Sequence, residues 1–317
     1  MQSPGSRGFV LFRSDMRDLA SLFDPALHIP TRLFELPSAN IAKGWSDFLS
    51  QIELRMHDRA FAEGFRQAAP FEGADAPEYN YRLIEREGLI VVLSLRFKAL
   101  SLTEPFIEVL LCDRVLDRDS LTLIRRVAKD EYSRFAPDRI RYFALDARPL
   151  LPDDQEDFAF FVGEINEIRK RPRPRRYSDV EVRPSASLEF YPKLQKVYQE
   201  LDRETGQELT PEGRESLQSS LDKGLLYEAF IDGEWAGMIS AHIMTERFLT
   251  GVFIVEEVIA EKFRGKGYAP AMQRKFIECL QDGKLVFGEI LWWNERSRKT
   301  ALRVGREKCG ATFFHHV

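Results

Sequence analysis

Cysteine is scarce in this chain of 317 residues, because Cys112, Cys279 and Cys309 are its only three and no two of them form a CxxC pair. An odd, scattered set argues against a disulfide framework and against a cysteine-based zinc site. Apolar runs are also short, as in Leu89–Leu93 and Phe158–Val162, whereas a helix that crosses a bilayer needs about 20 apolar residues. The sequence therefore predicts reduced thiols, no bound metal and no membrane span.

The first nine residues, MQSPGSRGF, lack the basic start and the apolar stretch of a secretory signal. We therefore expect a cytoplasmic protein. Hydrophobic residues make up 44% of the chain and charged residues 30%, which are the proportions of a folded globular protein. Single hydrophobic cores usually stop growing at about 250–300 residues, so the length predicts two domains. The sequence leaves the oligomeric state open.

Six basic residues and two prolines stand together in the segment 169–176. Proline removes backbone donors and like charges repel, so we interpret this segment as an extended, solvated linker between an N-terminal domain, 1–168, and a C-terminal domain, 177–317. A run of arginines can also bind the phosphates of nucleic acid. No aromatic residues interleave with these arginines, and both flanking domains carry more acidic than basic residues, which disfavours nucleic acid as a partner.

Hydrophobic periodicity predicts the order ααβββαβαβ in the C-terminal domain. The expected helices are 192–205, 212–223, one that ends at 280, and 298–308, and the expected strands are 225–231, 235–244, 252–259, 287–293 and 312–314. The N-terminal domain shows the shorter order αβββαβ, with helices at 41–67 and 120–135 and strands at 81–87, 89–97, 106–115 and 140–145. We therefore expect two structurally related halves, of which the first is a degenerate copy of the second.

The most informative segment is the glycine-containing junction 264–269, RGKGYA, between a predicted strand and a predicted helix. Gly265 and Gly267 let the backbone curl at the start of the helix, so several N–H groups can point at one anion. Arg264 and Lys266 add positive charge beside the helix dipole. The segment lacks both the Walker pattern and the last glycine of the dinucleotide-binding pattern, which disfavours a nucleoside triphosphate and a nicotinamide cofactor.

This junction matches the signature R/Q-x-x-G-x-G/A, and the region 177–317 resembles a GCN5-related N-acetyltransferase (GNAT) domain. The resemblance implies the GNAT fold, an α+β fold with a mixed, mostly antiparallel sheet flanked by helices, here in tandem with the degenerate first copy. It also implies acetyl coenzyme A as the co-substrate and a small-molecule or peptide amine as the acceptor. The main-chain groups implied to hold the pyrophosphate belong to six consecutive residues: Arg264, Gly265, Lys266, Gly267, Tyr268 and Ala269. The thioester carbonyl would bond a strand N–H near Val258 or Ile259.

A second resemblance lies at 293–305, which is similar to the asparagine-containing segment of the family. It implies that Asn294 contacts the pantetheine arm of the cofactor and that Ser297 lies against the cofactor at the start of the next helix. Both residue types are also common turn and N-cap residues, and one role does not exclude the other. Family members often carry a tyrosine in this helix that protonates the departing thiolate. Here the region reads VGR at 304–306, which leaves Ser297, Cys309 or water as the donor.

Two adjacent carboxylates, Glu256 and Glu257, stand on the strand that leads to the glycine junction. Neighbouring residues of a strand face opposite sides, so one of the two should face the substrate, and the sequence does not say which. That carboxylate would act as a base and take a proton from an ammonium acceptor. The alternative is that both are ordinary solvent-facing or salt-bridged residues. His242 is a less favoured base, which we expect to be structural.

The leading hypothesis is an acyl-CoA-dependent N-acyltransferase that transfers acetyl directly to a primary amine in a ternary complex. The missing tyrosine supports a different hypothesis, a coenzyme A-binding sensor or scaffold without turnover. The equivalent turn of the first half, 113–119, has no glycine and three carboxylates, which would repel a pyrophosphate. We therefore expect that only the second half binds coenzyme A.

Overall fold

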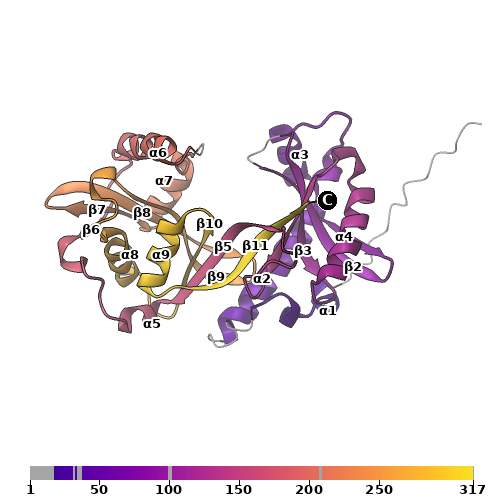
Figure 1. Ribbon diagram of the computed structural model, residues 1–317, viewed down its shortest axis with the longest axis horizontal. Coiled ribbons are helices and arrows are strands. Elements are labelled where there is room, and N and C mark those ends of the chain that lie inside the picture. Colours follow the sequence, from indigo (N-terminus) through magenta and orange to yellow (C-terminus); the bar gives the residue numbers. More distant parts are fainter. Residues whose placement is uncertain (1–17, 31–32, 34–37, 99–101, 207–208, 317) are drawn as a thin grey trace, which may run out of the picture.

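A computed structural model describes residues 18–30, 33, 38–98, 102–206 and 209–316. Within this part of the chain, the strands join into one eleven-stranded sheet in the order β1-β2-β3-β4-β11-β5-β10-β9-β8-β7-β6. Figure 1 shows two lobes side by side, with β5 and β11 running between them. The first nine residues, on which the expectation of a cytoplasmic protein rests, lie outside the described residues. No described helix is both long enough and apolar enough to cross a bilayer.

Most of the first half forms the right-hand lobe of Figure 1, while its last helix lies at the foot of the left-hand lobe. Its elements are α1 (Leu19–Leu22), α2 (Ser38–His57), α3 (Arg59–Ala68), β1 (Arg82–Arg86), β2 (Leu89–Phe97), β3 (Pro105–Cys112), α4 (Arg118–Glu131), β4 (Arg139–Ala144), β5 (Gln155–Glu164) and α5 (Ile165–Lys170). The predicted order αβββαβ is confirmed, although the helix expected at 41–67 is two helices. It breaks at Asp58, whose carboxylate caps α3 by accepting a hydrogen bond from the N–H of Phe61 (2.9 Å).

The second half supplies the other lobe. Its elements are β6 (Glu181–Pro184), α6 (Tyr191–Thr205), α7 (Arg214–Asp222), β7 (Leu226–Ile231), β8 (Glu234–Glu246), β9 (Leu249–Ile259), α8 (Tyr268–Cys279), β10 (Leu285–Leu291), α9 (Glu295–Val304) and β11 (Glu307–His316). The predicted order ααβββαβαβ is confirmed. The structure adds the short strand β6, which precedes the first predicted helix and pairs with β7.

Each half places its last strand beside the other half. In sequence β5 follows β4, yet it pairs with β10 and β11, and β11 in turn pairs with β4 as well as β5. The parallel pairs are also repeated, because β3 pairs with β4 as β9 pairs with β10. The two halves are therefore related by topology, and each of the regions 1–168 and 177–317 contributes a strand to the neighbourhood of the other.

Burial explains the sequence of the two exchanged strands. Both lie in the middle of the sheet, and central strands covered on both faces are apolar in consecutive positions instead of alternating. In β5 the run 159–162 is buried, and in β11 the buried run extends over 309–314. The apolar run at Phe158–Val162 is thus part of a central strand, which periodicity alone had not assigned.

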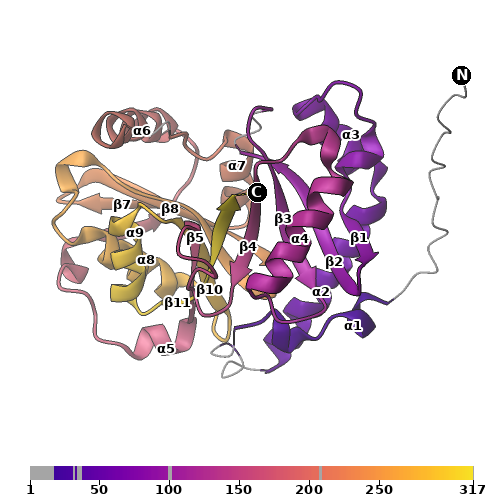
Figure 2. The same cartoon turned by 45° about the vertical axis from the view of Figure 1, so that its right-hand side comes forward.

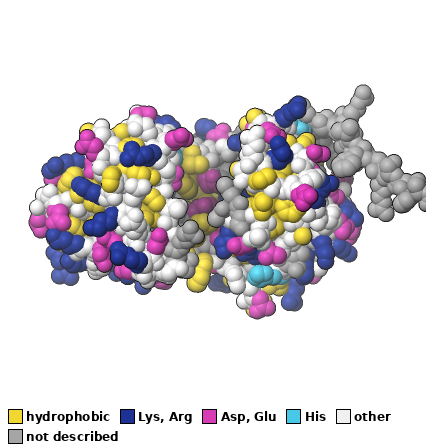
Figure 3. Space-filling model, turned by 90° about the horizontal axis from the view of Figure 1, so that it is seen from above, with side chains coloured by type: hydrophobic (Ala, Val, Ile, Leu, Met, Phe, Trp, Pro, Cys, Tyr) yellow, Lys and Arg dark blue, Asp and Glu magenta, His cyan; other side chains and the backbone are white. Residues whose placement is uncertain are grey.

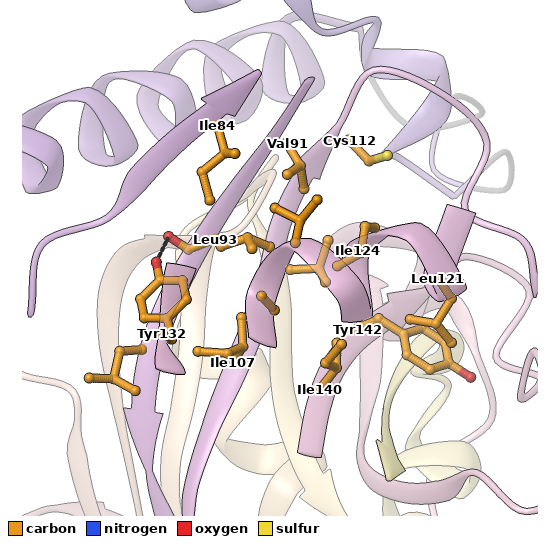
Figure 4. Close-up of a cluster of buried hydrophobic side chains, with 14 of the residues drawn as sticks. Ile84, Val91, Leu93, Ile107, Cys112, Leu121, Ile124, Tyr132, Ile140 and Tyr142 are labelled. Atoms are coloured by element: carbon orange, nitrogen blue, oxygen red, sulfur yellow. Dashed lines mark hydrogen bonds between the residues drawn. The ribbon is translucent and has the colours of Figure 1, made fainter. Parts of the chain in front are cut away.

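Helices cover the sheet on both faces (Figures 1 and 2). In the first half, α4 covers an apolar cluster that includes Val91, Ile107 and Ile124 (Figure 4), while α2 packs on the other face. The hydroxyl of Tyr132 donates to the carbonyl of Leu93 (3.3 Å) at the edge of the cluster. In the second half, α8 packs on one face, and α6 and α7 pack on the other.

Most of the basic segment 169–176 is exposed to solvent, whereas its first residue, Arg169, is bonded to α8. The guanidinium of Arg169 donates to the carbonyls of Ile277 (3.2 Å) and Glu278 (3.1 Å) in the last turn of α8, where the helix dipole favours a cation. Arg274 of α8 donates back to the carbonyl of Ile168 (2.6 Å). These bonds join the end of α5 to α8 and engage the guanidinium of Arg169 with protein carbonyls.

The strand exchange predicts that neither half is complete without the other. A fragment containing residues 177–317 would lose β5 from the edge of β10 and would leave β11 without both of its partners, so unpaired backbone groups and apolar side chains would be exposed. We expect this fragment to aggregate and to show no cooperative thermal unfolding by circular dichroism. A longer fragment, 151–317, which restores β5, is the matched control and should be more soluble. Cooperative unfolding of 177–317 at the temperature of the full chain would contradict this account.

Candidate functional site

The site begins where β9 and β10 separate. Their parallel pairing covers only three residues of each strand and ends at Phe253 and Phe287. A β-bulge follows in β9. Ser240 of β8 pairs with Glu256 and Ala241 pairs with Ile254, so Val255 between them has no partner on β8. Beyond the bulge, β9 keeps β8 as a partner and loses β10, so one edge of the strand is open.

The open edge carries an unpaired main-chain donor. The N–H of Ala260 donates to the carbonyl of Ala236 on the β8 side (2.8 Å). Since successive backbone groups of a strand alternate in direction, the N–H of Ile259 points toward the gap between β9 and β10. Ile259 is therefore the better placed of the two strand donors predicted for the thioester carbonyl, because Val258 faces β8.

The glycine loop presents further free donors at the start of α8. Gly265 (φ 73°) and Gly267 (φ 85°) both adopt the left-handed conformation, and Gly267 is the N-cap of α8 without a side-chain cap. Among the described residues, no acceptor is bonded to the main-chain N–H groups of 265–269. A Cβ atom at Gly265 would meet nothing within 4 Å. The loop therefore offers an open, electropositive surface of the kind that holds phosphates.

These features line one pocket with a volume of about 260 Å³. The predicted site residues in its wall are Glu257, Val258, Ile259, Arg264, Gly265, Gly267, Tyr268, Ala269, Asn294 and Ser297. Two predicted residues are absent from the wall, Glu256 and Lys266. The pocket lies between the end of β9, the N-terminal turn of α8 and the helix α9.

Glu257 is the carboxylate that faces the pocket. Its Oε2 atom accepts a hydrogen bond from the side-chain amide of Gln273 (2.5 Å), while its Oε1 atom is enclosed without a partner. Burial raises the pKa of Glu257 to about 7, although the nearby Arg306 and the bond from Gln273 act in the opposite direction. A carboxylate with this pKa can take up a proton at neutral pH.

Glu256 faces the opposite side of the sheet, as strand alternation requires. Both of its oxygens accept from the hydroxyl of Tyr198 on α6 (2.8 Å), and Oε2 also accepts from the N–H of Glu212 (3.0 Å). Burial raises its pKa as well, and the bonds from Glu212 and Tyr198 oppose the shift. Glu256 is therefore bonded between β9, α6 and the segment before α7, and it does not line the pocket.

Arg264 lines the pocket, and its guanidinium is bonded to other protein groups. Its guanidinium donates to the carbonyl of Ile259 (2.9 Å) and to the carboxylate of Glu204 on α6 (3.0 Å). The side chain is 11% exposed. The positive charge that we expected Arg264 to add beside the helix dipole is therefore paired with Glu204. Lys266 is exposed beside the loop and outside the pocket wall.

Asn294 is the N-cap of α9 and also lies in the wall of the pocket. Its side-chain oxygen accepts from the N–H of Ser297 (3.1 Å) and caps α9, and both residues line the pocket. Cys309, by contrast, is buried in the apolar cluster beneath α2. Of the two side chains proposed as proton donors for the thiolate, the pocket therefore contains Ser297 and not Cys309.

The helix α9 carries a basic stripe that we did not predict from the sequence. The cations of this stripe that line the pocket are Arg296, Lys299 and Arg303. Their spacing of three and four residues places them on one face of a helix, which could have been recognised once Asn294 was taken as the helix start. Together they add positive charge to the wall opposite the glycine loop.

The first half repeats the strand separation, and there the gap is filled. β3 has its own bulge at Leu110, and counted from the two bulges Cys112 holds the position of Glu257. Its side chain packs in the apolar cluster beneath α4 (Figure 4). The cavity that remains between β3 and β4 is only about 40 Å³ and is lined by Leu27 and His28 of the preceding segment.

The N-terminus of α4 is also closed to an anion. Asp117 caps the helix with its own side chain, which accepts from the N–H of Ser120 (2.9 Å). At α4 this carboxylate takes up a main-chain donor of the first turn. At α8 the N-cap is Gly267, which has no side chain to do the same. The structure thus gives two physical reasons for the expectation that the first half does not bind coenzyme A.

Other side chains that could bear chemistry lie elsewhere. His242 bonds the hydroxyl of Ser216 on α7 (2.8 Å), which agrees with a structural role. His315, on β11, bonds Asp154 (2.8 Å), and Trp292 is 56% exposed. Within the described part of the chain, no group of three or more histidine, cysteine, aspartate or glutamate residues could hold a metal ion.

Comparison with known proteins identifies the region that carries this site. Residues 194–305 match the model of the acetyltransferase (GNAT) family. The chain contains a GNAT acetyltransferase domain. The match runs from α6 to the end of α9 and therefore includes the strand separation, the glycine loop and Asn294. The family match supports an acyl-CoA-dependent N-acyltransferase in general. No curated protein matches the sequence.

Solved structures show how far the GNAT fold extends. A GCN5-related N-acetyltransferase from Sphaerobacter thermophilus is similar over 77% of this chain and 82% of that chain, with a TM-score of 0.51 and 11% identity. At this identity the likeness concerns the fold alone, and its coverage extends beyond the C-terminal half into the first half. A GNAT acetyltransferase from Colwellia psychrerythraea (8% identity, TM-score 0.47, 83% and 95% covered) and a tandem GNAT protein from the clavulanic acid pathway (10%, 0.42, 83% and 97%) are more distant.

The raised pKa of Glu257 predicts a stability effect with a defined sign. Its pKa of about 7 exceeds the ordinary value of 4.5. Protonated Glu257 therefore stabilises the folded state below pH 4.5, and this contribution is lost as the pH rises through 7. Glu257→Gln removes this loss. We expect the free energy of unfolding of the variant, relative to the natural protein, to be higher at pH 8 than at pH 5 by about 2 kcal/mol. Urea denaturation at both pH values measures the difference, and an equal effect at pH 5 and pH 8 would show that Glu257 titrates normally.

Proposed function

We propose that this protein is an N-acetyltransferase that transfers the acetyl group of acetyl coenzyme A directly to a primary amine in a ternary complex. The observation that carries the proposal is the single pocket of about 260 Å³. In it the free N–H groups of the glycine loop, the open edge of β9 and the carboxyl group of Glu257 meet. The family match at 194–305 supports the same activity class.

The charged and polar groups of the pocket wall suggest how the donor, acetyl coenzyme A, would lie in it. Its pyrophosphate would lie on the N–H groups of 265–269, where the dipole of α8 adds to the attraction. Its pantetheine arm would run between β9 and α9, past Asn294 and Ser297, which line that wall. The basic stripe of α9 borders the same space and would reduce the repulsion between the phosphates of the cofactor.

The proposed chemistry begins with the acceptor. An ammonium group gives one proton to Glu257, and the freed lone pair attacks the carbonyl carbon of the thioester, which forms the N–C bond. The oxyanion that develops would accept a hydrogen bond from the N–H of Ile259. When the tetrahedral intermediate collapses, the C–S bond breaks and the nitrogen releases its second proton to solvent. The thiolate takes a proton from water or from the hydroxyl of Ser297.

The alternative function is a coenzyme A-binding sensor or scaffold, which the absence of a tyrosine at 304–306 suggested. The enzyme is favoured because Glu257, with a pKa raised to about 7, lies in the pocket wall. Incubation with acetyl coenzyme A and a panel of amines separates the two functions. Release of free thiol with one of the amines supports the enzyme, whereas tight binding without thiol release supports the sensor.

Donor binding is predicted to depend on Gly267. In Gly267→Asp the new carboxylate would cap α8 as Asp117 caps α4, and it would repel the pyrophosphate. We expect calorimetry to show at least a 100-fold weaker affinity for acetyl coenzyme A, which corresponds to about 3 kcal/mol. Gly283→Asp is the matched control, because Gly283 also has a positive φ (71°) with nothing within 4 Å of its Cβ position. Equal affinities in the two variants would refute the phosphate-binding role of the loop.

The chemical step is predicted to depend on Glu257. Glu257→Gln keeps the size and the hydrogen-bonding capacity of the side chain but cannot accept the proton. We expect kcat to fall by about 10²–10⁴-fold, while the affinity for acetyl coenzyme A stays within twofold. Glu256→Gln is the comparison, because Glu256 lies on the other face of the sheet. A larger loss of kcat in Glu256→Gln than in Glu257→Gln would show that the base is Glu256.

A further inference from the structure

The basic segment 169–176 ends beside the glycine loop. Its last residue, Arg176, has its Cγ atom 3.9 Å from the position that a Cβ atom of Gly267 would take. The guanidinium carbon of Arg176 lies 5.6 Å from the centre of the Tyr268 ring. Gly267 is the N-cap of α8 and Tyr268 is its first residue, and both line the pocket. Arg176 is not part of the pocket wall, so it borders the loop from outside the pocket.

The next residue, Tyr177, explains how the segment holds this position. Its hydroxyl donates to the carboxylate of Glu278 near the end of α8, and its N–H donates to the carbonyl of Pro174 (2.9 Å). The carbonyl of Arg176 accepts from the N–H of Asp179 (3.1 Å). The side chains of Arg176 and Tyr177 therefore extend toward opposite ends of α8, and turns on both sides fix the backbone that carries them.

Arg176 keeps hydrogen-bond donors free for a ligand. Exposed Lys and Arg side chains are numerous on the lobe of the second half (Figure 3), so charge alone does not distinguish it. Its Nη1 atom donates to the carboxylate of Asp179 (2.9 Å), which is its only side-chain partner within the described part of the chain. A guanidinium has five N–H donors, and such an exposed ion pair is weak. The aromatic face of Tyr268 supports the guanidinium beside the loop.

The chemistry of coenzyme A indicates which phosphate would lie here. In the proposed pose the N–H groups of 265–269 hold the pyrophosphate, and the pantetheine arm runs inward between β9 and α9. The ribose is attached to the other end of the pyrophosphate, so its 3′-phosphate would leave the pocket beside the loop. A planar guanidinium binds such a phosphate through two parallel charge-assisted hydrogen bonds.

We propose that Arg176 binds the 3′-phosphate of coenzyme A and makes the protein prefer this donor to one that lacks the phosphate. This rests on the proposed function, because it takes acetyl coenzyme A as the donor. The proposal also gives the basic segment a role that the expectation of a linker did not include. Its last arginine contacts a phosphate of a nucleotide cofactor, and not the backbone of a nucleic acid.

The test is a thermodynamic cycle, measured by calorimetry on the full chain with acetyl coenzyme A and with acetyl 3′-dephospho-coenzyme A. In Arg176→Met the affinity for acetyl coenzyme A should fall about 10-fold, which corresponds to about 1.4 kcal/mol. The affinity for the dephosphorylated donor should not change, since the variant and the donor lack the same interaction. Arg183→Met is the matched control. Arg183 of β6 also pairs with a carboxylate, that of Glu181 (2.5 Å), and also lies over a ring, that of Phe230 (4.9 Å).

A second readout uses the reaction. In Arg176→Met the KM for acetyl coenzyme A should rise while kcat stays the same, and the thermal unfolding temperature should match that of the natural protein, because only an exposed ion pair is lost.

Equal weakening of both donors in Arg176→Met, an unchanged affinity for acetyl coenzyme A, or the same loss in Arg183→Met overturns the proposal. Binding of duplex DNA that is lost in Arg176→Met, with the affinity for acetyl coenzyme A unchanged, would assign the segment to nucleic acid instead. Failure of acetyl coenzyme A to bind the natural protein would refute the proposed function together with this inference.

Discussion

The short parallel pairing of β9 with β10 is the constraint on which the rest of the structure depends. Because the two strands pair over only three residues of each, β9 keeps a free edge directly before the glycine loop. The bulge at Val255 follows this pairing, and the two adjacent glutamates beyond it face opposite sides of the sheet. The free N–H groups of the glycine loop, the N–H of Ile259 and the carboxylate of Glu257 therefore meet in one pocket because β9 and β10 separate.

The two halves show that this separation alone does not make a binding site. Both halves have a bulge and a short parallel pair of strands. In the first half, however, Leu27 and His28 fill the gap between β3 and β4, and Asp117 caps the N-terminus of α4. In the second half Gly267 leaves the donors of α8 free. The exchange of β5 and β11 joins the halves into one sheet, so the first half supports the second through strand pairing.

The sequence predicted the elements of the second half and most of its pocket, because glycine at a strand-to-helix junction and helical periodicity are local signals. It did not predict β5 as a central strand, since an apolar run such as Phe158–Val162 does not say which strands it pairs with. The choice between Glu256 and Glu257 depended on a bulge, which no local pattern revealed. The pairing of Arg264 required the fold, because its partners Val197 and Glu204 come from α6, far away in the sequence.

A crystal structure with acetyl coenzyme A tests the central claim most directly. The account predicts a pyrophosphate within hydrogen-bonding distance of the main-chain N–H groups of 265–269 and a thioester carbonyl beside the N–H of Ile259. Density for the cofactor between β3 and β4, or on the surface away from the gap between β9 and β10, would contradict it.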